Sequence, residues 1–232
     1  MSDQDPVYVK NAFASIAKRY VLTNHVLSMG IDIFWRKRVA EIVAADEPKD
    51  ILDVATGSGD LAAEVSKACP DAKIIGSDFC PEMLDNARKR GLENLIVADG
   101  LDLPFEDNSF DALTIGFGLR NMADWAAALR EFKRVVKPGG RLVVLDFSLP
   151  ERGLFRSTYR FYLHHVLPKV AGVLAGNRAA YAYLGDSIER FPKGAAMQDL
   201  IEENFGAAES HEPTFEPLMG GISAIYSARL AV

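Results

Sequence analysis

Glycines lie where the chain leaves a short apolar segment and enters a helical one, in the run Asp53-Val54-Ala55-Thr56-Gly57-Ser58-Gly59-Asp60-Leu61. Because glycine has no Cβ, the backbone amides around Gly57 and Gly59 can approach a ligand closely at the start of a helix. Asp78 ends the next apolar segment, at the position from which a carboxylate can accept both hydroxyls of a ribose. Together these residues predict a pocket for an adenosine-containing ligand.

The glycine spacing by itself leaves the cofactor open. Gly57, Gly59 and Ala62 also satisfy the dinucleotide fingerprint, with alanine in its third place, so an NAD-dependent oxidoreductase is one alternative. A dinucleotide needs amides and a helix dipole for its pyrophosphate. S-adenosylmethionine has no phosphate, and instead needs carboxylates and carbonyls for its amino and sulfonium cations.

Further acidic residues favour the methyl donor. Asp53 precedes the glycine turn, Asp99 follows the third predicted strand ahead of Leu103-Pro104-Phe105, and Asn108-Ser109-Phe110-Asp111 introduces the fourth. This series resembles the motifs of class I methyltransferases, and an acid-rich pocket suits S-adenosylmethionine. We therefore expect S-adenosylmethionine as cofactor and no metal. A non-catalytic module that binds this donor or a partner is a further alternative.

Alternating strands and helices must position these residues. Apolar periodicity predicts strands at 50–55, 73–78, 95–98, 109–117 and 141–147, and helices at 61–68, 81–90 and 125–136. Segments 209–215 and 222–230 add two closing strands. The pattern predicts an α/β class with a mostly parallel sheet. The resemblance to class I methyltransferases implies their Rossmann-like fold, with a seven-stranded sheet and helices on both faces.

The length of 232 residues predicts one domain with a full core. We expect a helical preface at 1–47, a cofactor-binding core at 48–150, a helical lid inserted at 151–205 after the fifth strand, and closing strands at 206–232. The net charge of −6 argues against a nucleic-acid partner. Cys69 and Cys80 lack a metal or redox spacing.

Membrane signals are local. The acidic start is unlike a signal peptide and no apolar run has the length of a membrane span, so we expect a cytoplasmic enzyme. Segment 151–178 nevertheless combines five basic residues and one acid with several large apolar residues. It predicts peripheral contact with anionic lipid, with a solvated helix face as the alternative. A homodimer is compatible with the sequence.

Several longer segments indicate which family of methyltransferases the chain resembles. They are Phe13–Tyr20 with Asn24, Leu27–Gly30 and Trp35-Arg36; Phe117–Asn121; Leu145–Ser148; His165–Pro168; and Tyr181–Leu184 with Ser187-Ile188. On these segments the chain resembles the ubiquinone/menaquinone biosynthesis C-methyltransferases almost from end to end. The resemblance implies C-methylation of the quinol ring of a prenylated quinone precursor. Demethylmenaquinol is the first choice because the chain is compact, and 2-polyprenyl-6-methoxy-1,4-benzoquinol is the alternative.

The same resemblance implies cofactor contacts at Ser58, Asp78, Asp99 with Gly100, and Gly116. Two positions near them depart from the family pattern. Thr56 stands where the family usually has glycine, and Gly116 replaces a frequent serine. A contact at Gly116 would therefore involve its backbone alone.

The acceptor chemistry needs a base and a partner for an oxyanion, because the ring carbon attacks most easily when a neighbouring hydroxyl loses its proton. Arg120 and Asn121 follow the fourth strand, where a guanidinium would suit a developing phenolate, with a surface ion pair as the alternative for Arg120. Arginine keeps its proton, so Asp146, His165 or a polarised water is the candidate base. Asp146 could equally cap the next segment, and His165 could be a solvated helix residue.

Overall fold

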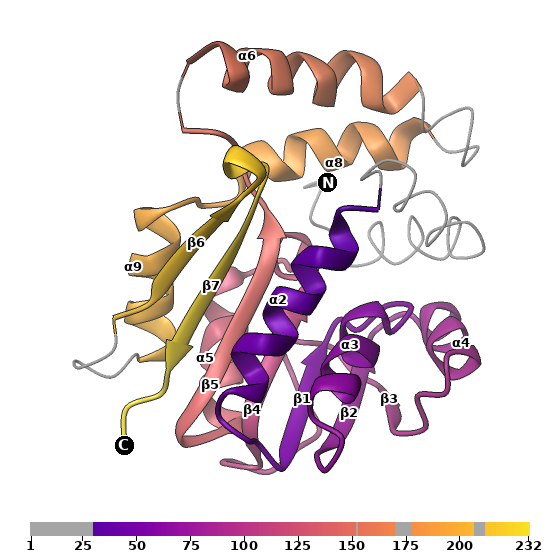
Figure 1. Ribbon diagram of the computed structural model, residues 1–232, viewed down its shortest axis with the longest axis vertical. Coiled ribbons are helices and arrows are strands. Elements are labelled where there is room, and N and C mark those ends of the chain that lie inside the picture. Colours follow the sequence, from indigo (N-terminus) through magenta and orange to yellow (C-terminus); the bar gives the residue numbers. More distant parts are fainter. Residues whose placement is uncertain (1–29, 152, 170–177, 207–211) are drawn as a thin grey trace.

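The computed structural model describes residues 30–151, 153–169, 178–206 and 212–232, and side chains within all of these ranges except 178–183. Most of the helical preface expected at 1–47 lies outside these ranges, and helix α2 (Asp32–Ala44) is the part of it that they contain. Across the described residues, seven strands form one sheet in the order β3-β2-β1-β4-β5-β7-β6 (Figure 1). This confirms the predicted α/β fold.

The strands are β1 (Asp50–Val54), β2 (Lys73–Asp78), β3 (Leu95–Val97), β4 (Phe110–Gly116), β5 (Val136–Phe147), β6 (Thr214–Leu218) and β7 (Ser223–Arg229). The pairs formed among β1 to β5 are parallel, whereas β7 runs antiparallel between β5 and β6. The carboxyl ends of β1 to β5 therefore share one edge of the sheet, where α/β folds bind their ligands.

Helices α3 (Asp60–Ala68), α4 (Pro81–Lys89) and α5 (Trp125–Val135) follow β1, β2 and β4. Local signals define their starts: Pro81 lies at the first turn of α4, and the Asp124 side chain caps α5 by accepting from the Ala127 amide at 2.9 Å. These crossovers are the reason that successive strands run parallel.

Two hydrophobic clusters cover the two faces of the sheet. On one face, residues of α2 and α3 such as Val39 and Val65 pack with Ile51. On the other face, Phe132 of α5 packs with Leu52 and with α9 (Ala195–Phe205). Neighbouring residues of β1 thus serve opposite faces, as the twofold periodicity of a strand requires.

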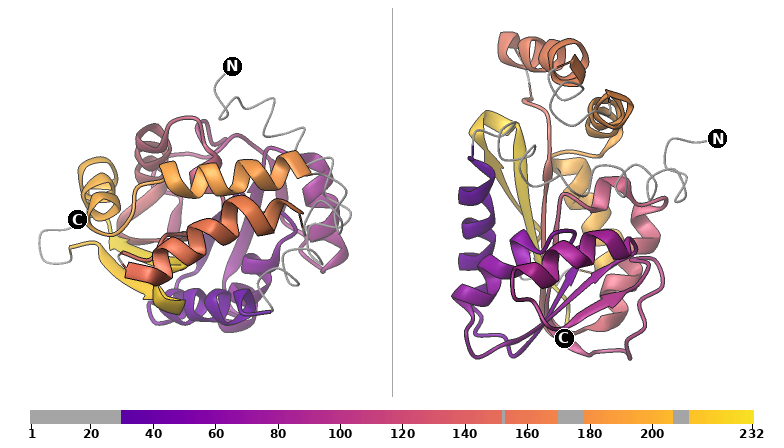
Figure 2. Two further views of the ribbon diagram at one scale, coloured as in Figure 1. Left: turned by 90° about the horizontal axis from the view of Figure 1, so that it is seen from above. Right: turned by 90° about the vertical axis from the view of Figure 1, so that its right-hand side faces the viewer.

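The segment 151–205 divides into two parts. Helices α6 (Gly153–Phe161) and α8 (Arg178–Arg190) lie side by side beyond the carboxyl ends of the strands, with the π-helical turn Tyr162–Val166 following α6 (Figures 1 and 2). Leu149, Leu163, Leu167 and Ile188 form a separate small cluster there. By contrast, α9 completes the main core beside α5. The α6–α8 pair is therefore the part of segment 151–205 that lies beyond the carboxyl ends of the strands, and its action as a lid stays a prediction.

Candidate active site at the carboxyl edge of the sheet

The turn between β1 and α3 has the backbone that its glycines allow. Gly57 and Gly59 have φ values of 57° and 76°, and Ala55 shares this left-handed region at 51°. A Cβ on Gly59 would lie 2.4 Å from Leu92 Cδ1, so glycine is required there for space as well as for conformation. The buried Ser58 hydroxyl donates to Asp60 at the start of α3.

Asp78 lies at the end of β2, directly against this turn. One carboxylate oxygen accepts from the Gly57 amide at 2.8 Å and the other from the Cys80 amide at 2.9 Å. Burial raises the pKa of Asp78 to about 6, although both hydrogen bonds oppose the rise. The structure thus brings together the predicted ribose-binding carboxylate and the predicted glycine turn.

Asp53 lies in β1 and is only 1% exposed. Its Oδ1 accepts from the Thr114 hydroxyl at 2.6 Å, whereas its Oδ2 is buried and has no hydrogen-bond partner among the described residues. Burial raises the pKa of Asp53 to about 6, and the Thr114 hydrogen bond opposes the rise. A buried carboxylate oxygen with no partner is a suitable acceptor for the amino group of S-adenosylmethionine.

A pocket opens at this edge, with about 540 Å³ of empty space when its open mouth is included. Its walls come from the ends of β1 and β2, the loop after β3 and the segment after β4; they are Val54, Ala55, Asp78, Phe79, Ala98, Asp99, Gly100, Leu101, Gly118, Asn121, Met122 and Ala123. A Cβ on Gly100 would lie 2.5 Å from Met122 Cε, so a side chain at this position would require the Met122 side chain to move. The two acidic residues in these walls, Asp78 and Asp99, suit a ligand that carries positive charge.

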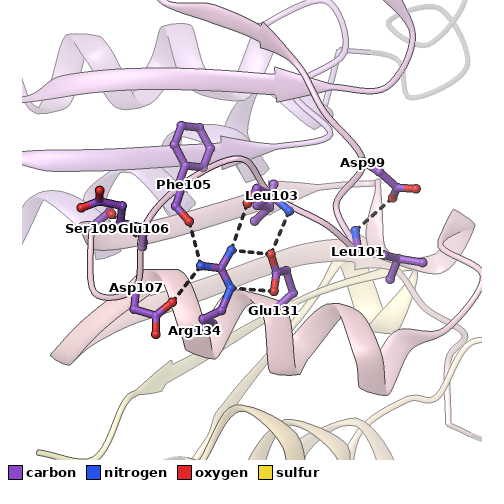
Figure 3. Close-up of polar contacts among 9 residues, drawn as sticks. All are labelled: Asp99, Leu101, Leu103, Phe105, Glu106, Asp107, Ser109, Glu131 and Arg134. Atoms are coloured by element: carbon purple, nitrogen blue, oxygen red, sulfur yellow. Dashed lines mark hydrogen bonds and ion pairs between the residues drawn. The ribbon is translucent and has the colours of Figure 1, made fainter.

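Arg134 binds the loop that continues from Asp99 (Figure 3). Asp99 itself is exposed and accepts from the Leu101 amide at 3.0 Å. Farther along this loop, Arg134 of α5 donates to the carbonyl oxygens of Leu103 and Phe105 at 2.9 and 2.7 Å. Glu131 pairs with Arg134 at 2.7 Å and accepts from the Leu103 amide at 2.8 Å. The loop after β3 is therefore tied to α5.

Arg120 and Asp146 form a buried ion pair next to this pocket. Arg120 lies in the short 3₁₀ helix Leu119–Asn121 after β4, and Asp146 lies near the end of the neighbouring β5. Their Nη1 and Oδ1 atoms are 2.8 Å apart, with side-chain exposures of 5% and 0%. The backbone amides of Arg120 and Phe147 also donate to Asp146, at 3.2 and 2.8 Å. Burial raises the pKa of Asp146 and Arg120 opposes this.

This geometry answers two questions that the sequence left open. The partner of Arg120 is buried, so the alternative of a surface ion pair is wrong. Asp146 does cap the backbone, since it accepts two amide hydrogens, and in addition it holds the Arg120 guanidinium.

Aromatic side chains surround the guanidinium. Arg120 Cζ lies 5.2 Å from the centroid of the Phe147 ring, which is 4.6 Å from that of Phe117, and Trp35 completes the cluster at 6.2 Å from Phe117. Asn121 donates to the Phe117 carbonyl at 3.2 Å and also lines the donor pocket. The predicted acceptor residues Arg120 and Asn121 therefore adjoin the donor pocket.

His165 lies elsewhere. Its ring stacks on Phe161 with centroids 4.7 Å apart, and the side chain is exposed. Within the described part of the chain, it makes no hydrogen bond or ion pair with Arg120 or Asp146. Its neighbour His164 contacts Glu189 at 3.0 Å. The structure does not join His165 to the acceptor residues.

Two buried or half-buried residues near the site were not among the predicted site residues. Burial raises the pKa of the Tyr159 hydroxyl, and the charge of Arg120 is close enough to oppose this rise. Arg36, on α2, is 8% exposed and lies over the Phe117 ring. The only sequence signal for Arg36 was its place in the segment Trp35-Arg36 that carries the family resemblance.

Comparison with known proteins identifies relatives that match this chain over most of its length. The demethylmenaquinone methyltransferase of Thermus thermophilus is 46% identical over 92% of this chain and 97% of its own. The ubiquinone/menaquinone biosynthesis C-methyltransferase UbiE of Bdellovibrio bacteriovorus is 40% identical over 96% and 95% of the two chains.

A solved SAM-dependent methyltransferase from Thermotoga maritima shares the fold, with a TM-score of 0.64 at 18% identity over 94% of this chain and 98% of its own. The model of the ubiE/COQ5 methyltransferase family matches residues 1–229. Because this match and the relatives span nearly the whole sequence, the chain belongs to the ubiE/COQ5 methyltransferase family.

Proposed function

We propose that this protein transfers a methyl group from S-adenosylmethionine to a ring carbon of demethylmenaquinol. The buried Arg120–Asp146 pair beside the acidic pocket is the observation that carries the proposal, because it presents a fixed cation next to the donor. The naphthoquinol is favoured by the name of the Thermus relative, and the benzoquinol alternative by that of the Bdellovibrio relative. Membership of a methyltransferase family argues against an NAD-dependent oxidoreductase.

The donor side of the site would hold the cofactor through three acids. Asp78 would accept from the ribose hydroxyls, Asp99 with the Gly100 backbone would face the adenine, and Asp53 Oδ2 would accept from the amino group. Gly57, Ser58 and Gly59 would shape the turn around the donor. Gly116, at the end of β4, would contact the donor through its backbone. When bound, S-adenosylmethionine supplies an electrophilic methyl group on its sulfonium.

On the acceptor side, Arg120 would stabilise the phenolate that develops as the ring carbon attacks. Asp146 accepts three N–H groups and has no exposed side-chain surface, so we infer that it positions Arg120 and does not act as the base. The hydroxyl proton would then leave through a water molecule that Arg120 polarises, since arginine keeps its own protons. Among the described residues, no contact joins His165 to this pair, so we do not assign it as the base.

A product assay tests the proposal. Isotope-labelled S-adenosylmethionine is incubated with a short-tailed demethylmenaquinol kept reduced, and mass spectrometry locates the label. We expect label on a ring carbon, and slower transfer to a 2-prenyl-6-methoxybenzoquinol. Faster transfer to the benzoquinol would mean that the benzoquinol, and not demethylmenaquinol, is the acceptor. If NADH raised the melting temperature and S-adenosylhomocysteine did not, the assignment of S-adenosylmethionine as donor would be contradicted as well.

We propose in addition that α6 brings the enzyme to the surface of a membrane. Leu154 and Phe161 of α6 are 84% and 60% exposed, with Arg156 between them. Among the described helices, none is long and apolar enough to cross a bilayer. Exposed apolar residues with basic neighbours match contact with an anionic surface.

Vesicles test this contact. The unaltered protein should sediment with vesicles rich in phosphatidylglycerol, and Leu154→Ser with Phe161→Ser should reduce the bound fraction. Val97→Ser is the matched control, because Val97 is an exposed apolar residue (53%) on β3, outside α6. Equal binding by all three proteins would contradict the proposal.

A further inference from the structure

Arg36 is a buried cation at the same edge of the sheet as the donor pocket. It lies in the first turns of α2, where its Nη1 forms an ion pair with Asp32. Its Cζ is 5.7 Å from the centroid of the Phe117 ring, directly after β4. Burial raises the pKa of Asp53, and the charge of Arg36 is near enough to oppose that rise. The Arg36 side chain therefore extends from α2 toward Phe117, directly after β4, and is near Asp53 of β1.

The guanidinium has hydrogen-bonding capacity to spare. Across the residues that the structure describes, Nη1 is the one nitrogen of Arg36 with a hydrogen bond or ion pair, and Nε and Nη2 have none. These two nitrogens can each donate to a further acceptor. The planar fork of arginine matches a carboxylate, which can accept from two of its nitrogens. An anionic group of a ligand would complete the site.

The amino-acid end of the donor carries such a group. It is a zwitterion, with an amino cation and a carboxylate on one carbon, and it needs an acid and a base close together. Asp53 Oδ2 is a buried acceptor without a partner, and Arg36 is the buried cation whose field reaches it. We propose that Arg36 binds the α-carboxylate of S-adenosylmethionine, held in place by Asp32. The inference concerns the donor and is independent of which quinol is methylated.

Removing the carboxylate from the ligand tests this pairing directly. Isothermal titration calorimetry compares S-adenosylmethionine with decarboxylated S-adenosylmethionine, which keeps the adenosine, the sulfonium and the amine. For Arg36→Gln we expect affinity for S-adenosylmethionine to fall about 10- to 100-fold, the range for a hydrogen bond to a charged group. Affinity for the decarboxylated donor should stay within about twofold of the unaltered protein. Arg36→Lys should lose less, because it keeps the charge.

Arg38→Gln is the matched control. Arg38 lies on the same helix, but it pairs with Glu216 at 3.0 Å on the surface, so this variant should keep the preference for the carboxylate. Because Arg36→Gln removes the cation that pairs with the buried Asp32, the double variant Asp32→Asn/Arg36→Gln is measured where the single variant is unstable. It should show the same selective loss.

Two results would overturn the assignment. An equal loss for both ligands would make Arg36 a structural residue, and an unchanged affinity for S-adenosylmethionine would remove it from the site. Saturable binding of S-adenosylhomocysteine by the unaltered protein checks the donor separately from the role of Arg36.

Discussion

The carboxylates on the two sides of the active edge are held in different ways. On the donor side, Asp53 and Asp78 accept hydrogen bonds from neutral groups, namely a hydroxyl and two backbone amides. Burial raises the pKa of each to about 6. On the acceptor side, Asp146 accepts from the guanidinium of Arg120 as well as from two amides.

In the function that we propose, this difference separates two tasks. The donor side keeps acidic oxygens for a ligand that brings its own positive charge. The acceptor side uses its acid to fix a cation that can meet negative charge as it develops. Losses on the donor side should therefore appear as weaker binding, and losses on the acceptor side as slower chemistry and lower stability.

The largest effect is expected when the buried pair loses its anion. Asp146→Asn removes the buried anion that forms an ion pair with Arg120, so the free energy of unfolding should fall by about 3–5 kcal/mol. Urea denaturation measures it. Asp107→Asn is the control, because Asp107 is an exposed partner of Arg134 and should change stability by less than about 1 kcal/mol. A similar small change in both variants would mean that the buried pair is unimportant.

The next effect is on turnover. Arg120→Ala should lower kcat by roughly 10²–10³, the range for losing one preorganised donor to an oxyanion, with donor affinity nearly intact. Arg120→Lys should recover only part of the rate, since a point charge replaces a planar fork. Steady-state kinetics on folded protein measures this, with the exposed Arg88→Ala as control. Turnover near that of the unaltered protein in both Arg120 variants would refute the role.

A smaller effect is expected in donor binding. Asp78→Ala should weaken S-adenosylmethionine binding by on the order of 1.5–3 kcal/mol, because the ribose hydroxyls lose a charged acceptor. Asp78→Asn should be milder. Calorimetry gives the values, and Asp85→Ala, on the exposed face of α4, is the control. If the alanine variant bound the donor as tightly as the unaltered protein, Asp78 would lie outside the site.

The smallest effect is a dependence on pH. A folded pKa of about 6 for Asp53 and Asp78 lies above the unfolded value, so in the ligand-free protein these groups contribute stability at low pH that is lost as the pH rises through about 6. Donor binding has the opposite sign because it uses the charged forms. Affinity for S-adenosylhomocysteine should fall between about pH 7 and 5, by at most roughly tenfold for each of the two carboxylates. A flat profile would contradict these pKa values.

The donor side could be predicted from the sequence because its signals are local. The glycine turn and the strand that ends at Asp78 are each defined within a few residues, and the parallel sheet then brings them together. The start of β5 was predicted at residue 141 but lies at Val136. The residues before 141 have the composition of a turn, so the sequence did not predict that Val136 pairs with Phe110. A register shift between this pair and the next accommodates them.

The acceptor side depends on contacts between distant segments. Arg120 and Asp146 could each be placed at the end of a strand, but their pairing follows from the neighbouring positions of β4 and β5. Arg36 likewise lies over Phe117 through a contact between distant segments, which no short motif encodes. The stacking of His165 on Phe161 is local, because the two residues are neighbours along one helical stretch.

One measurement tests the separation of donor and acceptor sides most directly. Single-turnover methyl transfer to demethylmenaquinol is followed for Asp78→Ala and Arg120→Ala over increasing concentrations of S-adenosylmethionine. We predict that Asp78→Ala approaches the rate of the unaltered protein once the donor saturates, whereas Arg120→Ala stays roughly 10²–10³ slower at every donor concentration. Recovery of Arg120→Ala by excess donor, or failure of Asp78→Ala to recover, would contradict the account.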